Sequence, residues 1–110
     1  MAIKVNGITI KTNTEGFLLD AGAWNEDVAE KIGDAHGVKL TEAHWEVISL
    51  VRNYCEQGNE PPSMRTLVKV VKLRLDQNKA KSIYLMKLFG ASPAKMVARL
   101  AGLPKPKNCL

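Results

Sequence analysis

The residue best placed to do chemistry is Cys109, whose thiol stands one position from the end of a 110-residue sequence. It follows the stretch Pro104-Lys105-Pro106-Lys107. Nearby cations lower the pKa of a thiol and so increase the reactive thiolate, although salt screens exposed charges beyond about 8 Å. An exposed thiolate attacks a persulfide or a disulfide, or becomes persulfidated itself. Composition alone leaves open the alternative, a C-terminal cysteine with no role.

Few other side chains are candidates for chemistry. Cys55 falls near the apolar face of an expected helix, where a free cysteine behaves as a small hydrophobe. His36 at a helix end and His44 beside Trp45 are typical of structural or solvated histidines. The sequence has no C-x-x-C pair, no P-loop, no G-x-G-x-x-G and no cluster with metal-ligand spacing. We therefore expect neither a cofactor nor a metal.

The formal charge of +5 is divided unequally along the chain. Residues 1–60 hold 5 Lys or Arg and 10 Asp or Glu, whereas residues 61–110 hold 11 Lys or Arg and a single acid. A basic half suggests an anionic partner, either nucleic acid or an acidic protein surface. Arg65 and Lys69, with Lys72, are candidates for a docking face, and the simpler alternative is a solvated face that maintains solubility.

Length and composition predict one globular domain. A chain of 110 residues buries about 65% of its unfolded surface, which suffices for a modest core. The hydrophobic fraction of 45% and the charged fraction of 25% are ordinary globular values. No apolar run approaches the roughly 18 residues of a membrane helix, and no signal peptide opens the sequence. We therefore expect a cytoplasmic protein with free thiols and no membrane contact.

The first eleven residues predict a β-hairpin. Apolar and polar residues alternate on both sides of Asn6-Gly7, a dipeptide that favours a type I′ turn because both central positions need a positive φ. Residues 13–16, Asn-Thr-Glu-Gly, then predict a turn. A hairpin this small needs another element to pack against.

The rest of the chain has helical periodicity and predicts a small orthogonal bundle of about five helices. The residues expected to cap these helices are Asn25, Thr41, Ser63 and Ser92 at the starts, and Gly37, Gly58 and Gly102 at the ends. The fourth helix is expected over residues 79–88, with Ile83 and Met86 mostly facing inward beside Leu85 and Leu88.

The chain changes character after Gly102. Two prolines stop any helix and favour an extended course, so we expect a helical domain over residues 1–102 and a flexible, projecting arm over residues 103–110. Fully extended, such an arm carries the thiol of Cys109 roughly 23 Å from the helix end.

Several short motifs, in a fixed order, resemble the DsrC/TusE family over nearly the whole chain. The ending Ala101-Gly102-Leu103-Pro104-Lys105-Pro106 with Cys109 is similar to the family's A-G-x-P-K-P-x-x-C-x pattern. The other matching segments are residues 14–18 (Thr-Glu-Gly-Phe-Leu), Trp24, residues 40–48 (Leu-Thr-Glu-Ala-His-Trp-Glu-Val-Ile), Pro62 with Arg65, Leu67 and Lys69, and Ser82 with residues 84–85 and 88–89.

The resemblance implies that Cys109 is the working thiol of a sulfur carrier, a sulfurtransferase-type protein rather than a stand-alone turnover enzyme. Proteins of the TusE type take sulfur from a TusBCD-type complex and deliver it to the enzyme that thiolates the wobble uridine of tRNA. The implied partners are therefore a TusBCD-like donor and an MnmA-like tRNA thiolase, with tRNA nearby. Arg99, Lys105 and Lys107 would stabilise the anionic sulfur and steer docking, and ordinary solvated charge is the alternative for them.

One departure from the family pattern favours one of two branches of the family. DsrC proper, the partner of dissimilatory sulfite reductase, carries a second cysteine eleven positions before the penultimate one, and Ala98 stands there in this chain. The loss favours a TusE-like role with one working cysteine. A DsrC-like partner of a sulfite reductase, or a related sulfur-oxidation carrier, is the second interpretation. A nucleic-acid-binding module resembling a helix-turn-helix is the third, because the helices are short and the C-terminal half is basic.

Overall fold

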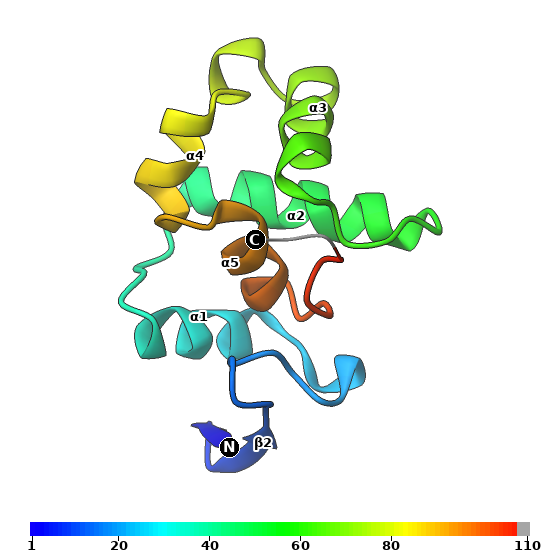
Figure 1. Cartoon of the computed structure of the whole chain (residues 1–110). Coiled ribbons are helices and arrows are strands. Elements are labelled where there is room, and N and C mark those ends of the chain that lie inside the picture. Colours follow the sequence, from blue (N-terminus) through cyan, green and yellow to red (C-terminus); the bar gives the residue numbers. More distant parts are fainter. Residues whose placement is uncertain (108–110) are drawn as a thin grey trace.

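The computed structural model describes residues 1–107, which form a two-stranded hairpin followed by five α-helices and two 3-10 turns (Figure 1). In chain order the elements are β1 (Ala2–Val5), β2 (Ile8–Lys11), η1 (Ala21–Ala23), α1 (Glu26–Ala35), α2 (Glu42–Glu56), α3 (Met64–Arg74), η2 (Gln77–Lys79), α4 (Ser82–Phe89) and α5 (Pro93–Leu100). The predicted fold, mainly helical with about five helices and an N-terminal hairpin, is confirmed.

The hairpin has the turn that its sequence predicts. β1 and β2 pair antiparallel, with Val5 opposite Ile8. The two turn residues, Asn6 and Gly7, have φ angles of 51° and 80°, as a type I′ turn requires. Val5 is buried and β1 packs against α1, which gives this small sheet the support that it needs.

Helix α5 lies at the centre of the bundle, in contact with α1, α2, α3 and α4 (Figure 1). Six of its eight residues are buried: Pro93, Ala94, Val97, Ala98, Arg99 and Leu100. Its small side chains allow close approach of the surrounding helices, whose own core residues include Ile32, Ile48, Leu67 and Leu85. Helices α2 and α3 cross steeply in Figure 1, which is the orthogonal arrangement expected. Helix α5, which leads into the arm, is therefore held in place by packing against four other helices.

Helix α4 differs from the sequence-based expectation in its bounds and in its orientation. It spans Ser82–Phe89, and Gln77–Lys79 form a separate 3-10 turn. Ile83 is 67% exposed and Met86 is 46% exposed, so their predicted inward orientation is wrong. The segment is apolar on nearly every side, and its periodicity therefore does not mark which side faces the core. Leu85 and Phe89, four residues apart, are the pair that is buried.

The described part of the predicted arm, residues 103–107, lies along the body of the protein. Leu103 is half-buried against the core and Pro106 is buried. Pro104, Lys105 and Lys107 are exposed. The division into a domain over 1–102 and a flexible arm over 103–110 stays a prediction, because residues 108–110 lie outside the described residues.

Candidate functional site

The C-terminal end of α5 is fixed by side chains from two other elements. The indole Nε1 of Trp24 donates to the carbonyl of Leu100 at 2.9 Å, and Arg52 Nη1 donates to the carbonyl of Ala101 at 2.6 Å. The guanidinium of Arg52 also lies 3.6 Å from the centre of a Trp24 ring. Carbonyls at a helix end have no partner within the helix, so these donors satisfy groups that would otherwise need water. The starting point of the arm is therefore held in one place.

Gly102 completes this helix end as a Schellman motif. Its N–H donates to the carbonyl of Arg99, and the N–H of Leu103 donates to the carbonyl of Ala98 at 2.9 Å. Gly102 has a φ of 72°, and a Cβ there would collide with the ring of Trp24. Glycine is thus required at the residue where helix gives way to arm.

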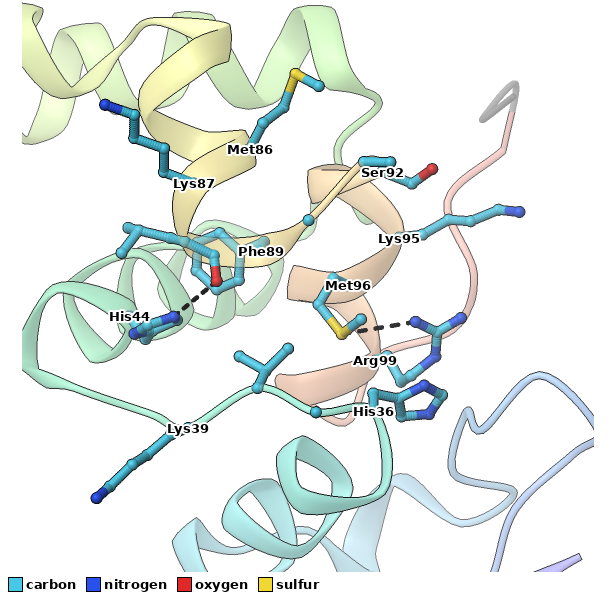
Figure 2. A pocket seen from close by; sticks show the side chains of 15 residues that line it. His36, Lys39, His44, Met86, Lys87, Phe89, Ser92, Lys95, Met96 and Arg99 are labelled. Atoms are coloured by element: carbon cyan, nitrogen blue, oxygen red, sulfur yellow. Dashed lines mark hydrogen bonds between the residues drawn. The ribbon is translucent and has the colours of Figure 1, made fainter.

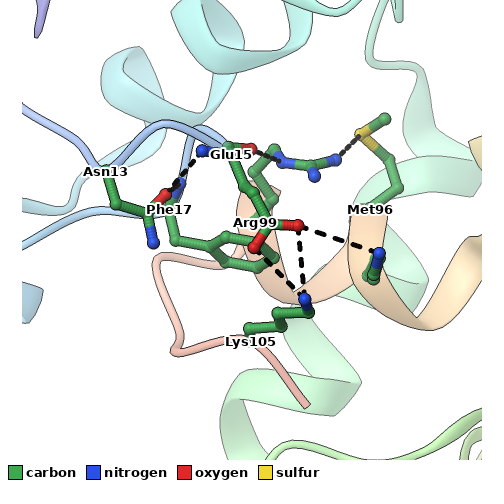
Figure 3. Close-up of polar contacts among 7 residues, drawn as sticks. Asn13, Glu15, Phe17, Met96, Arg99 and Lys105 are labelled. Carbon is green, nitrogen blue, oxygen red and sulfur yellow. Dashed lines mark hydrogen bonds and ion pairs between the residues drawn. The ribbon is translucent and has the colours of Figure 1, made fainter. Parts of the chain in front are cut away.

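Glu15 connects the arm to the turn before η1 and to α5 (Figure 3). Its carboxylate lies 3.2 Å from Lys105 Nζ and 3.8 Å from Lys95 Nζ. The hydrogen bond from Lys105 lowers the pKa of Glu15 most, with smaller contributions from the charges of Lys95 and Arg99 and an opposing effect of desolvation. The turn itself is held by the side chain of Asn13, which accepts from the N–H groups of Glu15 and Phe17.

Arg99 is a buried cation, 9% exposed, with its guanidinium beside the same turn. Its Nε donates to the carbonyl of Glu15 at 2.7 Å, and its Nη1 lies 3.6 Å from the sulfur of Met96. The ring of Phe17 stacks 4.8 Å from the guanidinium carbon. Burial lowers the pKa of Arg99, while the charge of Glu15 opposes that effect. Arg99 thus ties α5 to the turn and also lines the cleft described below.

The remaining arm cation, Lys107, pairs with Glu60 in the connector between α2 and α3, at 2.9 Å. Both partners are largely exposed, and exposed pairs of this kind contribute little to stability. Cys109, the predicted working thiol, lies outside the described residues. The structure therefore places three of the cations predicted to act with it: Arg99 is buried, and the ammonium groups of Lys105 and Lys107 engage carboxylates of the body.

A cleft of about 670 Å³ opens between the loop that joins α1 to α2, the end of α4 and one side of α5 (Figure 2). The cations among its lining residues are Lys39, Lys87, Lys95 and Arg99. None of its lining residues among 1–107 is an aspartate or a glutamate. Met86 and Met96 supply apolar surface. A cleft with this lining attracts negative charge and accepts apolar groups.

The two histidines at the cleft have different environments. His44 is buried, and its Nε2 lies 2.7 Å from the carbonyl of Leu88, to which it donates. Its Nδ1 then accepts from the N–H of Thr41, so the ring links the start of α2 to the end of α4. His36 is exposed at the end of α1, and partial burial lowers its pKa, with a smaller effect from the charge of Arg99. His44 is therefore a structural residue, which is one of the two roles expected for it from the sequence.

The predicted docking cations Arg65 and Lys69 are exposed on α3, one helical turn apart. Neither lines the cleft beside α5, so the structure does not bring them together with Lys95 and Arg99. Their role in docking stays a prediction. Cys55 is half-buried, and burial raises the pKa of its thiol against the smaller effect of Arg52. A raised pKa leaves little thiolate at neutral pH.

Within residues 1–107, no group of three or more histidine, cysteine, aspartate or glutamate side chains is arranged to hold a metal ion. None of the helices in the same part of the chain has the length and apolar character needed to cross a membrane.

Comparison with known proteins places the chain in one family. A family model described as DsrC-like protein matches residues 4–110. The chain is 44% identical over 108 residues to the sulfurtransferase TusE homolog of Haemophilus influenzae, covering 98% of this chain and 99% of that protein. It is 39% identical over 104 residues to sulfurtransferase TusE of Escherichia coli K12, covering 94% and 95% of the two chains. The protein belongs to the DsrC-like family, which confirms the resemblance predicted from its motifs.

Solved structures of the family share the fold. The structure superimposes on Allochromatium vinosum DsrC with a TM-score of 0.89 at 38% identity, covering all of both chains. The corresponding values are 0.86 and 35% for the oxidised γ-subunit of dissimilatory sulfite reductase (DsrC) from Archaeoglobus fulgidus, again over all of both chains. Ala98, which stands where the resemblance places the second cysteine of DsrC, is 1% exposed on the core side of α5.

Sequence reasoning missed three residues that position the arm. Trp24 was noted only as a motif residue, Arg52 was not assigned a role, and Glu15 was expected only within a turn. Their contacts join residues 76, 49 and 90 positions apart in the chain, and no local pattern indicates such pairs. The excess of cations after residue 60 was a weak signal that some of them pair with acids of the first half.

Proposed function

We propose that this protein is a sulfur-relay carrier that accepts sulfane sulfur as a persulfide on Cys109 and passes it to a partner. The observation that carries the proposal is the identity of 39–44% to TusE sulfurtransferases over nearly the whole chain. This agrees with the sulfur-relay function predicted from the sequence. The TusE-like form of the proposal places it in 2-thiolation of the tRNA wobble uridine, in the cytoplasm.

The chemistry needs no net oxidation or reduction. The thiolate of Cys109 attacks the outer sulfur of a donor persulfide, a bond forms between Cys109 Sγ and that sulfur, and the donor's S–S bond breaks. The donor leaves as a thiolate, and the transferred sulfur keeps its proton. Delivery repeats the exchange, with an acceptor thiolate attacking the sulfur now carried on Cys109. A carrier of this kind acts together with partners rather than turning over a substrate alone.

The fixed end of α5 supports this proposal. The Schellman motif at Gly102 and the donors from Trp24 and Arg52 hold the arm's base in one place. A thiol tethered to a fixed base reaches a partner's cleft at a raised effective concentration. Lys105 and Lys107 would exchange their exposed partners Glu15 and Glu60 for the anionic sulfur or for acidic groups of the partner. Arg99 would stabilise the anionic sulfur from its buried position near the end of α5.

The proposed partners are a TusBCD-like sulfur-donor complex and an MnmA-like tRNA thiolase, which brings tRNA close. A DsrC-like partnership with a dissimilatory sulfite reductase is the second candidate, favoured by the close structural similarity to DsrC. Alanine at position 98 weighs against that candidate, because the chain then lacks the second cysteine of the DsrC type. Co-purification with a reductase that depends on Cys109 would favour it. The helix-turn-helix-like interpretation requires nucleic-acid affinity that is independent of Cys109 and falls steeply with salt.

Intact mass spectrometry tests the carrier. The protein, Cys109→Ser and Cys55→Ser are each incubated with a cysteine desulfurase, cysteine and a small thiol relay. We expect a gain of one sulfur atom on the protein and on Cys55→Ser, and none on Cys109→Ser. Sulfur that persists in Cys109→Ser, or its absence from all three proteins with a competent donor complex present, would falsify the proposal.

A further inference from the structure

The cleft beside α5 carries positive charge that the fold itself does not use. Lys39 and Lys87 line it, and neither has an ion-pair partner among residues 1–107. Lys95 shares Glu15 with Lys105 at the longer distance of 3.8 Å. Figure 2 shows these lysines on separate segments around the opening. With no carboxylate among the lining residues, the cleft has a positive rim that attracts an anionic group.

Exposed apolar side chains adjoin this rim on α4. Met86 lines the cleft and is 46% exposed, and Ile83, three residues earlier and thus on the same side of the helix, is 67% exposed. Met96 adds a second thioether to the lining. Methionine side chains adapt to varied shapes and are frequent on surfaces that bind protein helices. A surface with cations around exposed apolar groups is complementary to a segment of another protein whose one side is acidic and whose other side is apolar.

These features favour a protein over a nucleic acid as the occupant. Single-stranded nucleic acids are bound by successive exposed aromatic rings on which bases stack. Phe89 is 1% exposed and His44 is buried, so His36 is the single exposed ring among the described lining residues. The guanidinium of Arg99 is already engaged with Glu15 and Met96. A volume of about 670 Å³ accommodates several side chains from one face of a helix.

We infer that the cleft and the adjoining side of α4 dock an acidic amphipathic helix of the protein that exchanges sulfur with Cys109. The identity of that protein as a sulfur partner rests on the proposed function, whereas the docking chemistry rests on the residues of the cleft. Apolar side chains of the helix contact Ile83, Met86 and Met96, and its carboxylates face Lys39 and Lys87. Docking at this cleft places the partner beside α5, the helix from which the arm begins.

The probe is a synthetic amphipathic peptide of about 15 residues, long enough to form a marginal helix, with leucines on one face and glutamates on the other. It is titrated into the ¹⁵N-labelled full chain and followed by two-dimensional NMR. We expect amide shifts concentrated at residues 36–39, 83–92 and 95–96. A peptide of scrambled order and a single-stranded RNA of equal charge serve as comparisons, and both should bind the cleft more weakly.

Two double variants separate position from net charge. Lys39→Glu with Lys87→Glu should weaken peptide binding by about tenfold, because both charges face the expected carboxylates. The matched control, Lys4→Glu with Lys11→Glu on the hairpin, changes the net charge equally and should leave the affinity within about twofold. Ile83→Ser with Met86→Ser should also weaken binding, and this loss should persist at high salt because it removes apolar contact.

The inference is overturned if millimolar peptide causes no shifts at the cleft, if the scrambled peptide binds equally well, or if the RNA binds the cleft more tightly. Loading of Cys109 by a small persulfide donor is measured by intact mass in the same variants. Normal loading together with slower sulfur transfer from a donor protein in Lys39→Glu with Lys87→Glu supports the inference. Absence of loading in every variant counts against the proposed carrier, while the peptide titration still decides the docking surface.

Discussion

At the scale of single residues, the two lysines of the arm have carboxylates of the same chain as their present partners. Lys105 engages Glu15 and Lys107 engages Glu60, both in exposed positions. Such pairs form and break easily, so they orient the arm without fixing it. Arg99 differs, because it is buried and donates to a backbone carbonyl. Arg99 therefore fixes α5 to the turn at Glu15, whereas exchangeable pairs hold the arm further along.

Replacing Lys105 by methionine should raise the pKa of Glu15 towards the ordinary value for glutamate, because the hydrogen bond from Lys105 is the largest cause of its depression. A depressed pKa means that the ionised carboxylate favours the folded protein. That stabilisation is present above the pKa of the unfolded chain and is lost as the pH falls through the lower, folded value. Carbon-detected NMR of the Glu15 carboxyl group measures the titration directly.

The control for this titration is Lys107→Met, which removes an arm cation whose partner is Glu60. We expect the pKa of Glu15 to be unchanged in that variant. An equal rise in both variants would mean that the general charge of the arm, rather than the bond from Lys105, depresses the pKa.

Cys55 should react slowly in the folded protein. Burial raises the pKa of its thiol, so less thiolate is present at a given pH. In Cys109→Ser, where Cys55 is the remaining cysteine, we expect alkylation by iodoacetamide at pH 7 to be about tenfold slower in buffer than in urea. The rate in buffer should increase with pH. Equal rates in the two solvents would show that the thiol is not protected by the fold.

At the scale of elements, the end of α5 is the feature that organises the site. Its C-terminal carbonyls accept from Trp24 and Arg52, and Gly102 turns the chain into the arm beneath the Trp24 ring. A helix end normally frays, but one that is capped by side chains of other elements remains ordered. The arm consequently departs from a defined point and in a defined direction.

Gly102→Ala should destabilise the protein more than Gly58→Ala. Both glycines have positive φ angles, 72° and 95°, so alanine costs about 1–2 kcal/mol of backbone strain at either position. A Cβ at Gly58 meets open space, whereas at Gly102 it collides with Trp24, which should add at least about 1 kcal/mol. Urea denaturation followed by tryptophan fluorescence measures both. Equal losses would contradict the tight packing of Gly102 under the indole ring.

Local signals in the sequence predicted the elements well, because caps and turns depend on neighbouring residues. Asn25 and Ser63 accept from backbone N–H groups at the starts of α1 and α3, as expected. Ser92 precedes Pro93 as expected, but its side chain makes no capping hydrogen bond. The helix boundaries follow largely from such signals, together with glycines of positive φ.

The candidate site was predictable only in part. The basic ending indicated the arm cations, but their partners Glu15 and Glu60 are brought close by tertiary packing. The cleft beside α5 depends on which side of α4 faces outward. That side was predicted wrongly, because apolar residues surround this helix and only packing selects Leu85 and Phe89 for the core.

At the scale of the whole molecule, the acidic and basic halves of the sequence do not simply neutralise each other. Some cations of the second half pair with acids of the first, as Lys79 does with Glu46. Others, including Arg65 and Lys69 on α3, are exposed without ion-pair partners among residues 1–107. The molecule therefore presents basic surface, and we expect its association with an acidic partner to be steered by charge.

Sulfur transfer from a donor protein should slow as salt increases, because screening shortens the range of this steering to about 8 Å at physiological ionic strength. Arg65→Glu with Lys69→Glu should slow the transfer several-fold at low salt if the exposed face of α3 meets the partner. Lys4→Glu with Lys11→Glu lowers the net charge of +5 by the same amount, at the hairpin. The rate of sulfur transfer to each variant is measured by quenching the reaction after rapid mixing, at several salt concentrations.

If both double variants slow transfer equally, the total charge steers the encounter and the α3 face has no special role. If the α3 variant alone is slower, and the difference disappears at high salt, the predicted docking role of Arg65 and Lys69 is supported.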